Sequence, residues 1–177
     1  LVVANAGNHI PSDPLNFDAE QYKQLMEVNY FGFLHTLQMS LPLLRKTRSP
    51  RIVGISSLAG FRGLPTSAAY GASKAAMTLF LESARFHFED AGIHTTIVHP
   101  GFVKTPLTDK NDFPMPFLID AEKAAKIICT GISKGKKEIA FPIPFSWFVK
   151  ALRLLPYPIY EYFVRTFVWK PYQRIKK

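Results

Sequence analysis

Residues 52–76 read IVGISSLAGFRGLPTSAAYGASKAA, and the predicted fold and function are both organised around this stretch. Its opening residues, 52–55, are apolar and rich in β-branched side chains, which predicts a buried strand. A loop with glycines and a proline follows, and then a run of small residues that favours a helix. On that helix Tyr70 and Lys74 are four residues apart and therefore share one face. The strand ends beside Ser57, which the loop can bring to the same place.

Tyr70 and Lys74 form a candidate acid–base pair. An ammonium group close to a phenol favours the phenolate, so a tyrosine with an ordinary pKa of about 10 can exchange a proton nearer neutral pH. The spacing alone is a weak signal, because Tyr172 and Lys176 repeat it near the end of the chain. That second pair follows neither a strand with serines nor a glycine loop, and we interpret it as coincidence.

Several further segments agree with the central stretch in order and spacing. The matching residues are Asn5-Ala6-Gly7, Asn29 with Gly32, Ser56, Ser57, Ala59, Gly60, Tyr70, Ser73, Lys74, Pro100-Gly101 and Thr105. With this set the chain resembles the classical short-chain dehydrogenases/reductases from Leu1 to Pro142. The resemblance implies an α/β fold with a Rossmann-like doubly wound parallel sheet, of which about four strands remain here. We expect residues 1–142 to be the C-terminal part of that NAD(P)-binding domain and residues 143–177 to be a basic, aromatic-rich helical tail.

The resemblance also implies roles for single residues. The implied catalytic residues are Asn29, Ser57, Tyr70 and Lys74. The implied cofactor-binding residues are Asn5, Ala6, Gly7, Tyr70, Lys74, Pro100, Gly101, Val103 and Thr105. Tyr70 would exchange a proton with the substrate oxygen that Ser57 holds, and Lys74 would lower the pKa of the tyrosine and bind the nicotinamide ribose. Asn29 would hold a water molecule of a proton relay, although its place on an apolar helix face fits a core amide that ties two elements together equally well. No metal site is expected.

The glycine-rich turn that receives the cofactor pyrophosphate in this family does not occur in the sequence, which contains no G-x-G-x-x-G. The residue that distinguishes NAD from NADP, which would follow the second strand, is absent too. We therefore expect the chain to be part of a longer protein and to be inactive by itself. The expected cofactor is NAD or NADP, without a choice between them.

Composition describes one globular domain that is mostly soluble and cytoplasmic. Of the 177 residues 47% are hydrophobic, and the mean hydropathy is +0.03. The single cysteine, Cys129, excludes an internal disulfide and fits a reducing compartment, and we expect it to be buried on a helix. No signal peptide is recognised at the start. We expect His9 at the surface of a loop.

Periodicity and capping residues predict the remaining elements. A helix at 19–46 is capped by Asp18 and contains Pro42, and the helix that carries Tyr70 continues to 91, with Leu79 on its apolar side, and ends at Gly92. A strand follows at 93–98. The last elements are a helix at 121–133, capped by Asp120, and an edge strand at 138–141. The turn after residue 98 contains His99, which we interpret as a packed, hydrogen-bonded residue.

Residues 106–119 read PLTDKNDFPMPFLI and show no period. The resemblance places a mobile lid over the substrate here. The apolar side chains of Phe113, Met115, Phe117 and Leu118 indicate a hydrophobic substrate, but burial of these side chains against the core is an equal alternative.

The tail, residues 143–177, holds seven basic residues and one acidic residue, and thus +6 of the net charge of +9. Its predicted helical faces are apolar, with Phe145, Phe148, Val149, Leu152 and Leu155 on the first and Ile159, Phe163 and Phe167 on the second. No apolar run is long enough to span a bilayer. Such an amphipathic pair can pack on the domain or a partner subunit, cover an apolar cleft, or lie in a membrane interface. No motif indicates nucleic-acid binding.

These observations predict an NAD(P)-dependent oxidoreductase that interconverts a hydroxyl and a carbonyl group on a small apolar substrate. Peripheral contact with a membrane through the tail and a homodimer through the two long helices are further expectations. The alternative is a non-catalytic relative that serves as a dinucleotide sensor or as a membrane-associated interaction protein.

Overall fold

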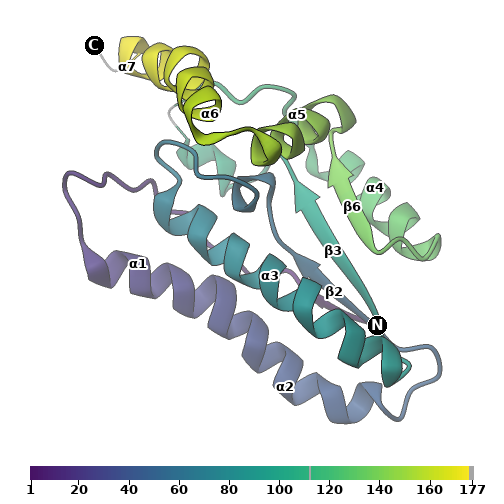
Figure 1. Ribbon diagram of the computed structural model, residues 1–177. Coiled ribbons are helices and arrows are strands. Elements are labelled where there is room, and N and C mark those ends of the chain that lie inside the picture. The colour runs from purple at the N-terminus through teal and green to yellow at the C-terminus, as the bar shows by residue number, and fades with distance from the viewer. Residues whose placement is uncertain (112, 176–177) are drawn as a thin grey trace.

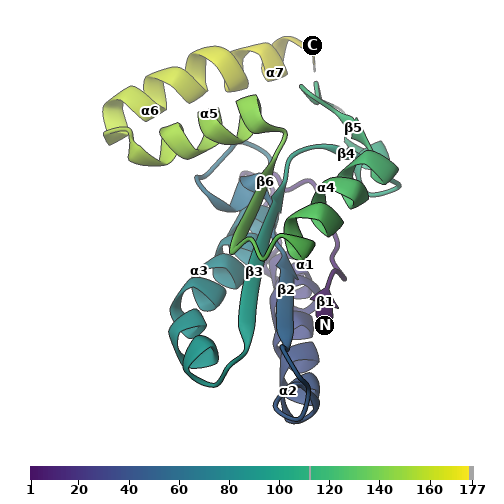
Figure 2. The same ribbon diagram turned by 90° about the vertical axis from the view of Figure 1, so that its right-hand side faces the viewer.

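A parallel sheet of four strands in the order β1-β2-β3-β6 forms the centre of the protein (Figures 1 and 2). The structure is a computed structural model that describes residues 1–111 and 113–175. The strands are β1 (Val2–Ala4), β2 (Arg51–Ile55), β3 (His94–Pro100) and β6 (Glu138–Phe141). Each neighbouring pair is parallel, with Val53 beside Val3 and Thr96. The predicted doubly wound α/β fold is therefore confirmed.

Helices cover both faces of this sheet. One face carries α1 (Ala19–Met26), a π-helical turn (Glu27–Phe31), α2 (Gly32–Leu44) and α3 (Ala68–Asp90), and the other carries α4 (Ala121–Ser133). Alternate strand residues point to opposite faces, so Ile52 packs under α2 and α3 whereas Val53 packs under α4. The sheet lies very close to α3, because a Cβ atom on Gly54 would be 2.4 Å from Leu81 Cδ1.

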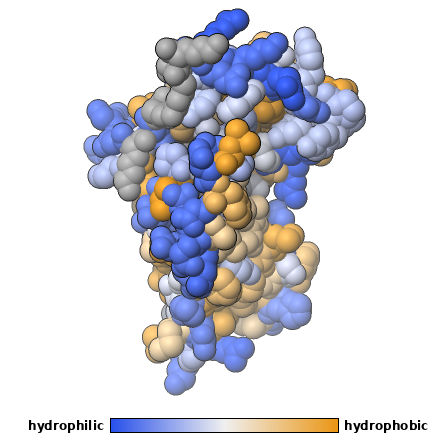
Figure 3. Space-filling model, turned by 90° about the vertical axis from the view of Figure 1, so that its left-hand side faces the viewer, coloured by the Kyte–Doolittle hydropathy of each residue, from blue (hydrophilic) through white to orange (hydrophobic). Residues whose placement is uncertain are grey.

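The long first helix begins and ends near the predicted positions. The backbone N–H of Glu20 donates to Asp18 Oδ1 at 3.0 Å, which confirms the predicted cap. The helix ends at Leu44 rather than at residue 46, with Pro42 in its last turn. On α2 and α3 the large side chains Met39, Leu43, Leu79 and Phe86 are exposed, so the prediction that Leu79 packs inward was wrong. Figure 3 shows apolar residues gathered on the lower half of the side where α2 lies.

The segment between β3 and α4 contains three short elements. These are β4 (Val103–Lys104), a 3-10 turn (Thr108–Lys110) and β5 (Ile119–Asp120), and β4 pairs with β5 in parallel. Asp120 occupies the N-cap position of α4, but its side chain makes no capping hydrogen bond, contrary to the prediction. Cys129 is exposed on α4, so its predicted burial was also wrong.

The tail forms a helical hairpin across the carboxyl end of the sheet (Figure 2). It consists of α5 (Ile143–Leu154), α6 (Tyr157–Val164), a π-helical turn (Arg165–Trp169) and α7 (Lys170–Ile175). The rings of Phe148 and Phe163, 6.0 Å apart, join the two arms. Within the described residues, no helix combines the length and the apolar character that a membrane crossing requires. Lys176, of the second Tyr-x-x-x-Lys pair, lies outside the described residues.

Candidate active site

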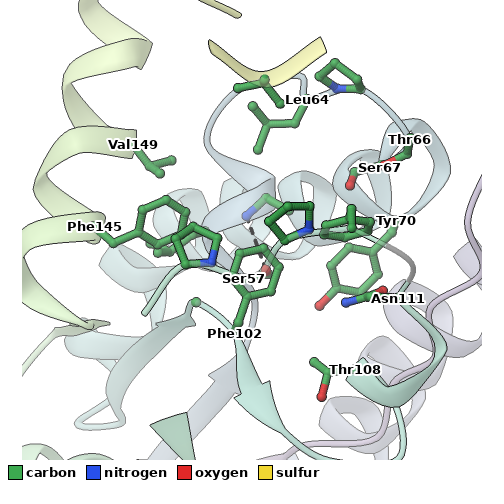
Figure 4. A pocket seen from close by; sticks show the side chains of 18 of the residues that line it. Ser57, Leu64, Thr66, Ser67, Tyr70, Phe102, Thr108, Asn111, Phe145 and Val149 are labelled. Atoms are coloured by element: carbon green, nitrogen blue, oxygen red, sulfur yellow. Dashed lines mark hydrogen bonds between the residues drawn. The ribbon is translucent and has the colours of Figure 1, made fainter. Parts of the chain in front are cut away.

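Ser57 and Tyr70 meet at the wall of a cavity of about 410 Å³ at the carboxyl edge of the sheet (Figure 4). Ser57 comes two residues after β2 and caps a 3-10 turn (Leu58–Gly60), in which the Ala59 N–H donates to Ser57 Oγ at 3.2 Å. Tyr70 lies in the first turn of α3. The two hydroxyl groups are neighbours, and Ser57 acts to lower the pKa of the Tyr70 phenol. Sequence spacing therefore predicted correctly that these two hydroxyl groups come together.

Lys74 lies one helical turn beyond Tyr70 and is almost completely buried, with 4% of its surface exposed. Its Nζ atom donates to the Ile55 carbonyl oxygen at 2.9 Å and is 5.8 Å from the centre of the Tyr70 ring. Burial lowers the pKa of the Lys74 ammonium to about 8. The lysine is therefore still mainly charged at neutral pH.

The pKa of Tyr70 differs from the sequence-based expectation. Burial raises this pKa above its ordinary value, and the hydrogen bond from Ser57 offsets part of the rise. The Lys74 ammonium is directed to the Ile55 carbonyl oxygen, and desolvation of the buried phenol is the largest influence on its pKa. Tyr70 is therefore a neutral phenol at neutral pH, which is the form that can donate a proton.

Asn29 is fully buried in the π-helical turn, a feature that often occurs at functional sites. Its Oδ1 atom accepts from the Asn8 N–H at 2.7 Å, and its Nδ2 atom donates to the Asn8 carbonyl and to Ser73 Oγ, both at 2.9 Å. These contacts are those of a core amide that joins the first long helix, the loop after β1 and α3. The relay role of Asn29 stays a prediction.

The turn at Asn5, Ala6 and Gly7 borders the same polar groups. A Cβ atom on Gly7 would be 3.2 Å from both Asn29 Oδ1 and Lys74 Nζ, so only a residue without a side chain leaves these two atoms accessible. The lysine ammonium has three N–H groups, and one is used by the Ile55 carbonyl within the described residues. A buried cation with further donors beside a glycine fits a group rich in hydroxyls, such as the ribose of a nicotinamide cofactor.

The other predicted cofactor contacts are Pro100, Gly101, Val103 and Thr105, of which the first two line the cavity. A Cβ atom on Gly101 would be 3.1 Å from Pro142 Cδ and 3.3 Å from the Phe141 carbonyl oxygen, so this glycine is also needed for packing. Thr105 Oγ1 donates to the Val103 carbonyl at 3.3 Å. Pro100 and Gly101 thus share the cavity with Tyr70, whereas Val103 and Thr105 are not among the residues that line it, and the contact of all four with a cofactor stays a prediction.

Two residues of the site, His9 and Asn111, have a place that sequence reasoning misjudged or missed, whereas a third, His99, lies where it was expected. His9 is buried rather than exposed, and its ring contacts the Tyr70 ring edge-on at a centroid distance of 5.0 Å. Asn111 also lines the cavity, and its Oδ1 atom is buried without a hydrogen-bond partner in the described part of the chain. His99 is packed as predicted, with its Nδ1 atom 3.4 Å from the Ser57 carbonyl oxygen, and burial lowers its pKa to about 4.

The rest of the cavity wall is mainly apolar and comes largely from residues 106–119 and from the tail. The apolar lining includes Leu58, Leu64, Phe102, Leu107, Phe113, Phe145, Phe148, Val149, Leu152, Phe167 and Val168. Figure 4 shows Phe102, Phe145 and Val149 around the space that Ser57 and Tyr70 face. The tail therefore packs on the domain and covers an apolar cavity, which were two of its predicted arrangements.

Comparison with known proteins identifies the class to which this fold and site belong. A family model described as short chain dehydrogenase matches residues 1–114, and the chain belongs to this family of oxidoreductases. An uncharacterized oxidoreductase of Myxococcus xanthus is 38% identical over 161 residues, which are 91% of this chain and 64% of the relative. Estradiol 17-beta-dehydrogenase 2 of Mus musculus is 38% identical over 112 residues, 63% of this chain and 29% of that protein.

Solved structures confirm the fold. A short chain dehydrogenase from Burkholderia cenocepacia J2315, in complex with NADP, superposes with a TM-score of 0.81 at 24% identity, covering 93% of this chain and 68% of the other. The chain therefore spans about two thirds of the length of such proteins.

Proposed function

We propose that the full-length protein is an NAD- or NADP-dependent oxidoreductase that interconverts a hydroxyl and a carbonyl group on an apolar substrate. The observation that carries this proposal is that Ser57 and Tyr70 line the same apolar cavity, with the buried Lys74 ammonium behind them. Bound NADP in one structural neighbour and bound NAD in a Burkholderia phymatum neighbour support the choice of cofactor class.

In the direction of reduction, a carbonyl oxygen at the cavity wall would accept hydrogen bonds from the hydroxyl groups of Ser57 and Tyr70. The bound cofactor supplies the hydride. Tyr70, a neutral phenol because of its raised pKa, donates its proton to the oxygen as negative charge develops there. The ammonium of Lys74 then stabilises the phenolate, and oxidation of an alcohol uses the same groups in reverse.

The cavity wall sets the proposed substrate class. Its lining residues are mostly apolar, so binding should depend on the apolar area that the substrate buries. These walls also exclude water from the reacting atoms, which strengthens the hydrogen bonds of Ser57 and Tyr70 to the substrate oxygen. We place the reaction centre in the 1–142 domain and treat residues 143–177 as its cover.

Turnover of a homologous series of unbranched ketones tests this proposal. With the full-length protein and NADH or NADPH, kcat/KM should rise about fourfold for each methylene that the cavity buries, since one buried methylene contributes about 0.8 kcal/mol. The measurement is the rate of cofactor consumption. Binding of the dinucleotide without turnover of any carbonyl or alcohol would instead favour the non-catalytic sensor.

We also propose that the outer face of the tail contacts the surface of an anionic membrane on the cytoplasmic side. Large exposed side chains there are Trp147, Leu154, Tyr157 and Tyr162, and they are accompanied by exposed basic residues, Arg153, Arg165 and Lys170. Exposed aromatic residues together with positive charge match the interface of an anionic lipid layer. The exposed apolar side chains of α2 and α3 support the expected homodimer on a different face.

Sedimentation with lipid vesicles tests the membrane contact. The full-length protein should bind vesicles of phosphatidylserine and phosphatidylcholine but not vesicles of phosphatidylcholine alone, and Trp147→Ser should weaken binding about tenfold because an interfacial anchor is lost. Met39→Ser, which removes an exposed side chain from α2, is the matched control and should bind vesicles normally. Equal binding by Trp147→Ser and the unchanged protein would contradict this contact.

A further inference from the structure

Arg62 joins the loop that carries Ser57 to the tail. Its guanidinium carbon lies 4.2 Å from the centre of the Tyr160 ring and 5.9 Å from that of Tyr157. Its Nη1 atom donates to the Arg153 carbonyl oxygen at 3.2 Å. One side chain of the loop therefore contacts both arms of the tail hairpin.

These contacts are concentrated at the corner of the hairpin. Arg153 is in the last turn of α5, where carbonyl groups lack partners within the helix and a cation is favourable. Tyr157 and Tyr160 are in the first turn of α6, and the Tyr160 hydroxyl donates to the Gly63 carbonyl of the same loop. Burial raises the pKa of Tyr160, so it stays a neutral donor. The loop and the corner thus hold each other through a cation–π contact and hydrogen bonds in both directions.

The position of this corner determines the shape of the cavity. The tail supplies the wall on both arms, with Phe145, Val149 and Leu152 from α5 and Phe167 and Val168 from the turn after α6. Directly before Arg62 in the chain, Phe61 packs on His99 at a ring distance of 4.4 Å, and His99 contacts the Ser57 carbonyl. The loop therefore links the reacting hydroxyl of Ser57 to the cover of the cavity.

We propose that Arg62 is a positioning residue that holds the tail over the cavity and thereby sets the affinity for large apolar substrates. The effect on substrates depends on the proposed function, whereas the attachment of the tail does not. A small carbonyl compound reaches Ser57 and Tyr70 without touching the tail, so its turnover is independent of Arg62.

Hydrogen exchange and steady-state kinetics of the full-length protein test this role together. In Arg62→Ala, backbone exchange of residues 157–169 should be about tenfold faster, because two ring contacts and a hydrogen bond are lost. KM for a large apolar carbonyl substrate should rise about tenfold while kcat, and the kinetics with a small carbonyl, stay unchanged. Arg62→Lys keeps the charge over the ring and should restore most of both properties.

Two further variants make the result decisive. Tyr160→Leu removes the partner ring and the hydrogen bond to Gly63 from the tail side. Combined with Arg62→Ala it should cost less than the sum of the two single changes, because both break the same cation–π contact. Lys126→Ala is the matched control, since Lys126 pairs with Glu122 on the exposed surface of α4 and should alter neither property. Unchanged exchange in Arg62→Ala, or an equal loss of activity on small and large substrates, would overturn the proposal. If no carbonyl is turned over at all, the proposed function fails. Hydrogen exchange of residues 157–169 still shows whether Arg62 attaches the tail to the domain.

Discussion

Replacing Tyr70 with phenylalanine is expected to lower kcat about 1,000-fold, because a positioned proton donor contributes roughly 10²- to 10⁴-fold to a rate. The ring is kept in Tyr70→Phe, so its contact with the His9 ring and its place in α3 are unchanged. Only the hydroxyl, which lies beside Ser57 at the cavity, is lost. The measurement is kcat of the full-length protein with the best ketone of the series described above.

The control for this variant is Tyr162→Phe, which removes a hydroxyl from a tyrosine that is 68% exposed on the tail. Its kcat should equal that of the unchanged protein. Titration with the dinucleotide should give nearly the same Kd for Tyr70→Phe, because the loss is in proton transfer and not in cofactor binding. If Tyr70→Phe turns over the ketone at close to the normal rate, Tyr70 is not the proton donor and another group must serve.

The order of strands and helices was predictable because parallel strands must be apolar on both faces. The run at 52–55 packs on α2 and α3 with Ile52 and on α4 with Val53, so it shows no alternation. Local chemistry likewise fixed Asp18 as a cap and Gly92, with a φ of +73°, as the end of α3. Each of these features depends on residues that are neighbours in the chain.

The features that the sequence did not predict depend on residues far apart in the chain. His9 is buried only because its loop is folded against Tyr70, and the pKa of Tyr70 is raised by burial that no local pattern records. Cysteine is usually a buried residue type, but Cys129 is exposed on α4. The contact between Tyr160 and Gly63 joins residues 97 positions apart, and the local sequence around neither residue predicts it.

The tail shows how far the reading of its composition could go. Of the residues on its predicted apolar faces, Val149 and Leu152 are buried, whereas Phe148, Ile159 and Phe167 are exposed. The same pattern was compatible with packing on the domain, with covering a cleft and with a membrane interface, because amphipathicity states only that one face is apolar. In the folded chain Arg62 contacts Tyr160 and joins the tail to the loop after β2. Trp147 stays exposed in this arrangement.

Replacing Asn29 with alanine is expected to lower the free energy of unfolding by about 3 kcal/mol. The change removes one amide that is fully buried and leaves the N–H and carbonyl groups of Asn8 and the hydroxyl of Ser73 without their partner. A buried polar group without a partner costs roughly 1–3 kcal/mol. The Asn8 carbonyl can bind water instead, and the Ser73 hydroxyl still donates to the Tyr70 carbonyl oxygen. The total loss of unfolding free energy should therefore stay near the upper end of the cost of a single unpaired group. Urea denaturation of the full-length protein gives the value.

The matched control is Asn16→Ala, which removes an exposed amide that donates to Asp13 at 2.7 Å and should change the unfolding free energy by less than about 0.5 kcal/mol. Asn29→Asp separates structure from catalysis, because it keeps the acceptor for the Asn8 N–H but cannot donate to the Asn8 carbonyl. A loss of stability in both Asn29 variants, matched by a similar loss of the bound fraction of cofactor, identifies a brace for the turn at residues 5–7. If Asn29→Ala is as stable as the unchanged protein but turns over substrate slowly, the amide serves proton transfer and its hydrogen bonds to Asn8 contribute little to the fold.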